Sequence, residues 1–95
     1  MAAYLIADHE VLDEERIVEY RRQVLPTVEK HGGRIIVRGG ATEVLEGDWR
    51  PHRVVVIEFP TMAGLKAWYH SPEYQRLVPL RQRAERGSLI AVEGV

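Results

Sequence analysis

The chain contains no cysteine among its 95 residues, which excludes disulfide bonds, thiolate nucleophiles and cysteine-based metal sites. It also lacks any apolar run that approaches the roughly 20 residues needed to span a bilayer. The N-terminal segment MAAYLIADHE has no basic start and turns acidic after a short apolar stretch, unlike a signal peptide. We therefore expect a cytoplasmic protein with no membrane partner.

The chain also lacks an excess of charge of either sign. Its 13 basic and 14 acidic residues leave a formal net charge of −1, and the arginines are scattered among acids. Proteins that bind nucleic acids in general rely on clustered basic side chains to neutralise phosphates. The composition therefore argues against a nucleic-acid partner.

Motifs for metal ions and nucleotides are missing as well. The four histidines, His9, His31, His52 and His70, include no pair at the i, i+4 spacing of a helical metal site. The glycines of GGRIIVRGG at 32–40 flank a predicted strand, and the segment lacks the GxxxxGK[ST] pattern of a phosphate loop. We expect neither a metal site nor a cofactor.

Aromatic residues are scarce too, at 7% of the chain, yet three of them gather in AWYHSPEYQ at 67–75. Rings beside a histidine, a serine and a glutamate suggest a reactive site. The segment Ser71-Pro72-Glu73 nevertheless has a structural explanation, because serine caps helices, proline suits the first helical position and glutamate favours the positive helix end. The stretch is predicted to separate two helical pieces, which leaves His70 for chemistry.

Apolar periodicity and turn residues predict one domain, residues 1–95, with four strands and two helical regions. The strands are expected at 3–7, 34–38, 53–59 and 89–93, and the helices at 13–31 and at 62–69 followed by 72–84. The order strand–helix–strand–strand–helix–strand is typical of the ferredoxin-like βαββαβ fold of the α+β class. We expect a four-stranded antiparallel sheet in the order 4-1-3-2 with the helices on one face.

The segment between the second and third strands is expected to bend and then pair. Gly39-Gly40 would break the second strand, and residues 42–45 would resume extended structure before a hairpin loop at 46–51. Trp49 in that loop has no local apolar run to cover it. We favour packing of its ring on a partner subunit or on its own hairpin over contact with a ligand.

The predicted strands are apolar on both of their faces, most clearly at 54–57 and 89–92. A sheet with helices on one face and water on the other should instead alternate apolar and polar residues. A chain of this length has no further element to cover the second face. We therefore favour a homodimer that packs sheet against sheet over a monomer.

Six short motifs follow one another along nearly the whole chain: GGRIIVRGG (32–40), EVLEGDWRP (43–51), VVIEFPT (55–61), WYHSPEYQ (68–75), LR (80–81) and VEG (92–94). In combination they resemble the family called domain of unknown function 1330, of the dimeric α/β-barrel superfamily. The resemblance implies a ferredoxin-like protomer whose sheet meets that of a second protomer. Superfamily relatives include cofactor-free monooxygenases, isomerases and dehydratases, with sites in a cavity between sheet and helices. No superfamily-wide catalytic motif can be transferred.

The predicted sheet order brings the ends of the first and second strands and the start of the third to one edge, near the end of the following helix. We interpret as ligand-binding the residues Arg38, His52, Trp68, Tyr69 and Tyr74. His9 and His70 are candidates for proton transfer, because imidazole titrates near neutral pH. The alternative is that the histidines are solvated and the arginines form surface ion pairs.

Glu58 and Glu93, near the ends of the third and fourth strands, could form a carboxylate pair for acid–base work. Arg34 starts the second strand at the same edge and could pair with Glu58 instead. We favour the ion pair, because a strand-end carboxylate needs a partner to be buried. Glu58 stays a third candidate for proton transfer.

Two functions remain open from the sequence. The first is a small homodimeric protein that binds a small apolar or aromatic ligand between sheet and helices, with a cofactor-free monooxygenase, isomerase or dehydratase as its enzymatic form. The alternative is a non-catalytic structural or interaction module that forms a stable dimer. An enclosed pocket that touches the histidines would favour the first, and a solid core there would exclude it.

Overall fold

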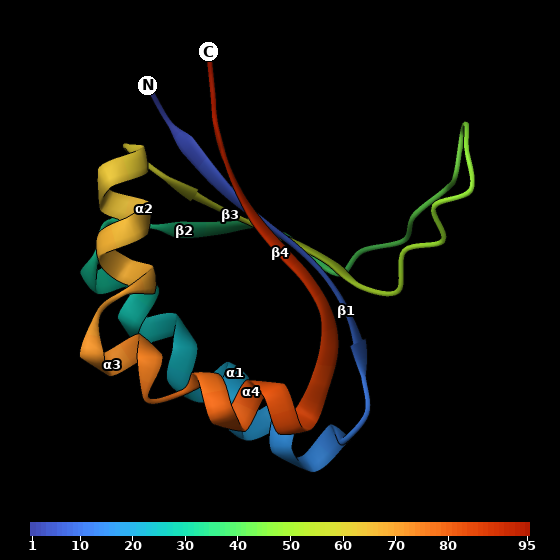
Figure 1. Ribbon diagram of the computed structural model, residues 1–95, viewed down its shortest axis with the longest axis horizontal. Helices are drawn as coiled ribbons and strands as arrows, with labels where there is room; N and C mark the ends of the chain where they lie inside the picture. Colours follow the sequence, from blue (N-terminus) through green and yellow to red (C-terminus); the bar gives the residue numbers. More distant parts are fainter.

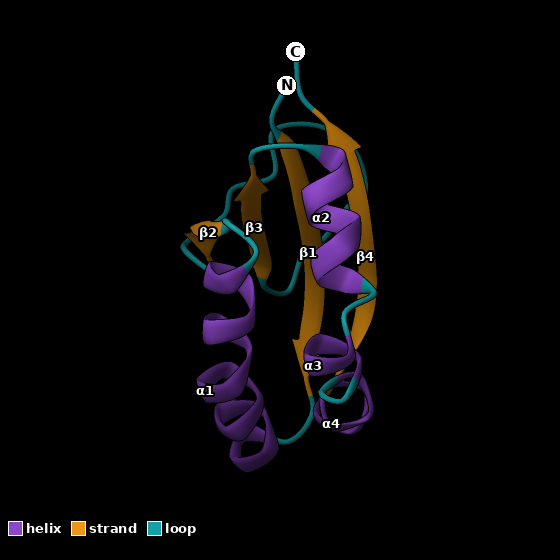
Figure 2. Ribbon diagram, turned by 90° about the vertical axis from the view of Figure 1, so that its left-hand side faces the viewer, coloured by secondary structure: helices purple, strands orange, loops and turns teal.

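Four strands and four helices follow one another in the computed structural model, which describes residues 1–95 (Figure 1). They are β1 (Ala3–Val11), α1 (Glu14–Lys30), β2 (Arg34–Arg38), β3 (Val54–Phe59), α2 (Met62–Tyr69), α3 (Pro72–Gln75), α4 (Val78–Ala84) and β4 (Glu85–Glu93). The strands form one antiparallel sheet in the order β2-β3-β1-β4, which is the predicted order read from the other edge. The helices lie on one face of this sheet, so the predicted ferredoxin-like α+β architecture is confirmed (Figure 2).

The central strand β1 alternates strictly between the two faces of the sheet. Ala3, Leu5, Ala7 and His9 are buried beneath the helices, while the residues between them are only partly covered. This period of two is what a strand with one covered face requires. The inward side chains of β1 and β3 pack on an apolar stripe of α1, where Val24 and Val28 lie, and on the aromatic residues of α2 and α3.

The helix starts follow the capping chemistry of the sequence. The Asp13 side chain accepts a hydrogen bond of 3.1 Å from the backbone nitrogen of Arg16 and so caps α1. Ser71 caps α3 in the same way through the backbone nitrogen of Tyr74, at 3.2 Å, and Pro72 takes the first helical position. The break predicted within AWYHSPEYQ is confirmed.

The helical region after that break differs from the prediction of one helix over 72–84. It divides into α3 and α4, because Pro79 has no N–H to donate to the carbonyl of Gln75 and so cannot continue α3. The chain then passes from Ala84, the last residue of α4, directly into β4 at Glu85 without a loop. Strand β4 is therefore longer than predicted, and it pairs with β1 over nine residues.

The segment at 39–53 forms no strand, so the prediction of extended structure at 42–45 is wrong. The ladder between β2 and β3 ends where the Gly39 nitrogen donates to the carbonyl of Val54 at 2.7 Å. Beyond this point a two-stranded ribbon would have no core to cover it, and such a ribbon is only marginally stable in water. Leu45, which is 84% exposed, shows that the segment has no covered face. The segment instead projects from the sheet on the side away from the helices (Figure 1).

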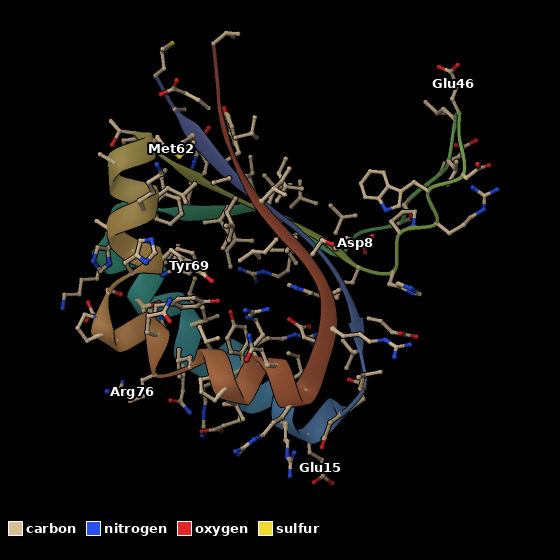
Figure 3. The ribbon with its side chains drawn as sticks, viewed as in Figure 1. Asp8, Glu15, Glu46, Met62, Tyr69 and Arg76 are labelled. Atoms are coloured by element: carbon tan, nitrogen blue, oxygen red, sulfur yellow. The ribbon has the colours of Figure 1, made fainter.

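Asp8 holds the base of this projecting segment, which we call the loop 39–53. Its carboxylate accepts hydrogen bonds from the indole nitrogen of Trp49 at 2.8 Å and from the backbone nitrogen of His52 at 2.9 Å. Burial raises the pKa of Asp8, but these hydrogen bonds outweigh it and hold the pKa below its usual range. Figure 3 shows Asp8 where β1 meets the loop, with Glu46 at the loop tip.

The face of the sheet opposite the helices is apolar and uncovered in the single chain. It presents the outward residues of all four strands, among them Ile6, Val37, Val56, Ile90 and Val92, and we call it the open face. Ile90 is 56% exposed and Val92 is 42% exposed. The chain has 6264 Å² of accessible surface, against about 5,600 Å² for a typical folded monomer of this mass.

Gly33 allows the close approach of α1 and β3. A Cβ atom at this position would lie 2.6 Å from the ring of Phe59 and 2.9 Å from Val28, and both side chains are fully buried. The substitution Gly33→Ala should therefore lower the free energy of unfolding by about 1–3 kcal/mol through overpacking. Gly40→Ala is the matched control, since a Cβ there meets nothing within 4 Å. Equal stability of the two variants in urea unfolding would contradict this packing.

Candidate functional site

A cavity of about 230 Å³ lies between the helix-covered face of the sheet and α1. Twelve of its 18 lining residues are hydrophobic, which suits an apolar ligand body. Its apolar wall is formed mainly by inward residues of β1 and β3, such as Leu5 and Ile57, and by the α1 stripe that includes Ile17 and Val24. An engineered apolar cavity of about 150 Å³ holds benzene, so this volume admits one ring with a short substituent.

His9 lines one end of the cavity and is buried between two ionisable side chains. Its Nδ1 lies 3.2 Å from Oε1 of Glu85, and its Nε2 lies 3.4 Å from Nη1 of Arg81. Burial lowers the pKa of His9, and the charge of Arg81 lowers it further. The neutral ring that fits both neighbours carries its proton on Nδ1, donates to Glu85 and accepts from Arg81. Gly87, opposite His9 on β4, leaves room for the ring, because a Cβ there would lie 2.9 Å from it.

Glu85 is a buried carboxylate, and burial raises its pKa while the charges of Arg81, Arg21 and Arg53 act to lower it. Its position follows from the direct passage of α4 into β4, which places Arg81 and Glu85 four residues apart on either side of the junction. Together with His9 they form a chain of three ionisable groups at the inner wall of the cavity.

Four arginines line the cavity: Arg21, Arg38, Arg53 and Arg81. None of them takes part in an ion pair, although ion pairs occur elsewhere on the surface. Burial lowers the pKa of Arg53, and the charges of Arg21 and Arg38 lower it further. This end of the cavity is therefore positively charged, with Glu85 as its only acidic lining residue.

The rings that line the cavity are held by contacts within the chain. Trp68 and Tyr74 pack with their centroids 4.2 Å apart and their planes tilted by 37°, and the Trp68 nitrogen donates to Oγ1 of Thr27 at 3.0 Å. The hydroxyls of Tyr20 and Tyr74 are 3.0 Å apart and satisfy each other. Burial raises the pKa of Tyr20, so its hydroxyl stays protonated at neutral pH. These rings offer contact area and shape instead of acid–base chemistry.

The structure brings four of the sequence-predicted site residues to this cavity, namely His9, Arg38, Trp68 and Tyr74. His70 and Tyr69 line a different, more open groove between α2, α4 and the outer edge of β4. Figure 3 shows Tyr69 on α2. The two sets separate because the helical period turns Tyr69 and His70 away from the direction of Trp68.

His52 and Glu58 lie outside both depressions. His52 belongs to the loop 39–53, where its backbone nitrogen donates to Asp8. Glu58 lies on the open face, and its Oε1 accepts from Nε of Arg34 at 2.9 Å. The ion pair favoured from the sequence is confirmed.

Sequence reasoning missed Arg81, Glu85, Tyr20 and Arg21 as cavity residues. Tyr20 was recognisable from its place on the apolar stripe of the first helix. Arg81 and Glu85 carried a weaker signal, because a spacing of four residues can place two side chains close together. The segment from Glu85 onward was not predicted to be a strand, so its place beside the first strand was missed.

No group of three or more histidine, cysteine, aspartate or glutamate side chains is placed to hold a metal ion. No helix combines the length and the apolar composition that crossing a bilayer requires.

Comparisons with known proteins place the fold among relatives of unknown function. Residues 2–95 match the family described as Domain of unknown function (DUF1330). A protein of unknown function from Rhodopseudomonas palustris has a similar structure, with a TM-score of 0.80 and 21% identity over 99% of this chain and 82% of that one. A dimeric ferredoxin-like protein of unknown function from Jannaschia sp. CCS1 has a TM-score of 0.74 and 18% identity over 99% of this chain and 100% of that one.

A third solved structure is described as an antibiotic biosynthesis monooxygenase. It has a TM-score of 0.58 and 18% identity, and the match covers 100% of this chain and 99% of that one. No curated protein matches the sequence. At these identities the structural likenesses establish the fold alone.

The buried, neutral state of His9 predicts a pH dependence of stability. Because burial lowers its pKa below the ordinary 6.5, the unfolded chain binds a proton below about pH 6.5 that the folded chain does not. The free energy of unfolding should therefore fall as the pH drops from 7.5 to 5.5. His9→Gln removes this titration while keeping a donor for Glu85. The free energy of unfolding of this variant, measured in urea, should therefore fall less steeply with decreasing pH than that of the wild type.

Two features make this measurement specific to His9. Burial raises the pKa of Glu85 above 4.5, so protonation of Glu85 raises the free energy of unfolding as the pH falls, opposite to the effect of His9. The glutamine variant retains the Glu85 carboxylate, so this contribution is the same in both proteins. His70→Gln, which removes an exposed imidazole outside the buried cluster, is the matched control for the loss of a histidine side chain. An equally steep decline in His9→Gln and the wild type would mean that His9 is not held neutral.

Proposed function

The chain belongs to the family described as Domain of unknown function (DUF1330), and we propose that it is a homodimeric protein that binds a small ligand with an apolar or aromatic body in the cavity beneath α1. The observation that carries this proposal is the composition of the cavity wall. An apolar surface large enough for one ring ends at three buried ionisable side chains, His9, Glu85 and Arg81. Buried ionisable groups lower stability, and they gather where a cavity has a function.

Of the three sequence candidates for proton transfer, we place the role on His9. Its neutral ring lies beside a carboxylate that would stabilise the imidazolium, as in a histidine–carboxylate pair. The contact of 3.4 Å between its Nε2 and Arg81 is long, so the lone pair of Nε2 is weakly engaged and could accept a proton from a ligand. His70 lies in the open groove and Glu58 is paired with Arg34, which makes both less suited.

A cofactor-free reaction of the monooxygenase, isomerase or dehydratase type is compatible with this arrangement. Each such reaction can begin with removal of a proton from the ligand, which a neutral imidazole can perform. The neighbour described as an antibiotic biosynthesis monooxygenase supports the choice of these classes through its fold alone.

Ligand binding can be tested with a thermal-shift panel of small aromatic and short-chain apolar compounds that includes 3-phenylpropanoate and 3-phenylpropanamide. A compound that binds only the folded state raises the melting temperature. Val55→Phe fills the cavity from β3, so compounds that stabilise the wild type should bind this variant at least about tenfold more weakly. Val18→Phe, on an α1 side chain that is 60% exposed, is the matched control and should bind normally.

Two results would count against the ligand proposal. One is a panel in which no compound stabilises the wild type, and the other is equal binding to Val55→Phe and the wild type. Either result, with the dimer intact, would leave the non-catalytic dimeric module as the function.

Dimerisation through the open face is the second part of the proposal. Apolar residues such as Ile90 and Val92 are exposed there, and the solved neighbour from Jannaschia sp. CCS1 is described as dimeric. Exposed apolar surface of this extent is typical of an interaction face. The loop 39–53, with the 60% exposed ring of Trp49, borders the same face and would extend the contact with a second copy.

Light scattering at micromolar concentration should give twice the monomer mass of 10.9 kDa. Val56→Asp places a charge in the middle of the open face, opposite Ile6 and Val37, and should convert the dimer to monomer because an unpaired charge would be buried. Val18→Asp on the outer side of α1 should remain dimeric. A wild-type mass of 10.9 kDa, or a dimer that survives Val56→Asp, would refute the proposed interface.

A further inference from the structure

The guanidinium groups around the cavity have no carboxylate partners of their own. Five basic side chains elsewhere in the chain do have partners, among them Arg34 with Glu58 and Arg86 with Glu10, each at 2.9 Å. The four cavity arginines have no such pair, and the side chains of three of them make no hydrogen bond either. The fold therefore gathers four guanidinium groups at one place, with Glu85 as the only carboxylate among them.

Arg81 is the most deeply placed of the four, at 9% exposure. Its only side-chain hydrogen bond is the long contact with His9, and its Nε is buried with no partner. A buried donor without an acceptor destabilises the folded state, and for a charged group the loss is larger than for a neutral one. An acceptor supplied from outside the chain would relieve this deficit.

Arg53 is held over the cavity by the turn that ends β2. Gly39 adopts φ +65°, and a Cβ there would lie 2.7 Å from Nε of Arg53, so the glycine lets the arginine side chain lie across the backbone. From this position Arg53 lines the cavity together with Arg21 of α1 and Arg38 of β2. Three elements thus bring cations to one end of a cavity whose remaining wall is apolar except for His9 and Glu85.

We propose that the ligand of this cavity is a small carboxylate, with its apolar body on the wall formed by β1, β3 and α1 and its carboxylate among Arg21, Arg38, Arg53 and Arg81. This inference rests on the proposed function and adds the chemical class of the ligand. A planar guanidinium matches a carboxylate through two parallel hydrogen bonds, and desolvated pairs of this kind are stronger than neutral ones. The volume of about 230 Å³ limits the body to about one ring with a short chain.

The test compares two probes of nearly equal shape, 3-phenylpropanoate and 3-phenylpropanamide, by isothermal titration calorimetry on the intact wild-type protein. The acid should bind at least about tenfold more tightly than the amide, since hydrogen bonds to charged groups contribute more than neutral ones. Inorganic phosphate, which carries charge without an apolar body, should bind more weakly than the acid.

Arg53→Gln should weaken binding of the acid by about tenfold or more while leaving the affinity for the amide unchanged. Arg38→Gln, at an exposed side chain on the cavity rim, is a second variant with the same expected result and little risk to folding. Arg76→Gln is the matched control and should leave both affinities unchanged, because Arg76, the residue that follows α3, does not line the cavity (Figure 3).

The outcomes separate this inference from the proposal on which it rests. Equal affinities for acid and amide, both lost in Val55→Phe, would overturn the carboxylate preference and leave ligand binding in the cavity standing. Phosphate binding as tight as that of the acid, or wild-type acid affinity in both Arg53→Gln and Arg38→Gln, would also overturn it. If neither probe nor any other panel compound binds, the proposed function itself fails.

Discussion

The rest of the molecule depends on one interaction, the pairing of the central strand β1 with both of its neighbours. β1 pairs with β3 on one side and with β4, along nine residues, on the other. Because successive side chains of a strand point to opposite faces, this register decides which residues enter the cavity and which face outward. Asp8 and His9 are neighbours in the chain, yet Asp8 anchors the loop 39–53 and His9 lines the cavity. One strand thus supplies both the proposed interface and the proposed site.

The helix-covered half of the molecule combines two kinds of packing. Around Trp68 and Tyr74 the rings and their hydrogen bonds are satisfied within the chain. Around His9 and Arg81 the packing is incomplete, with a buried donor that has no acceptor. Natural proteins tolerate such local losses of stability where a site needs them. This contrast within a single layer of side chains is the reason we propose a ligand site here, because empty cavities in proteins are apolar.

Much of the fold could be predicted from the sequence because its signals are local. The period of the α1 stripe and the capping residues Asp13 and Ser71 act within a few residues, and the structure follows them. The segment 85–88 reads ERGS, which has no strand signal, and it becomes a strand only because β1 is there to pair with it. The place of Glu85 at the start of a strand that lines the cavity could therefore not be predicted from the local sequence. The prediction of extended structure at 42–45 failed because these residues have no neighbouring strand to pair with and no core to cover one of their faces.

The direct passage from α4 into β4 has a consequence for how the family can vary. Loops absorb insertions and deletions, and the exposed loop 39–53 is suited to such changes in length. Between Ala84 and Glu85 there is no loop to absorb anything. One residue added or removed there would shift the register of β4 and turn every side chain of that strand to the opposite face. Length variation among relatives should therefore gather in the loop and avoid this junction.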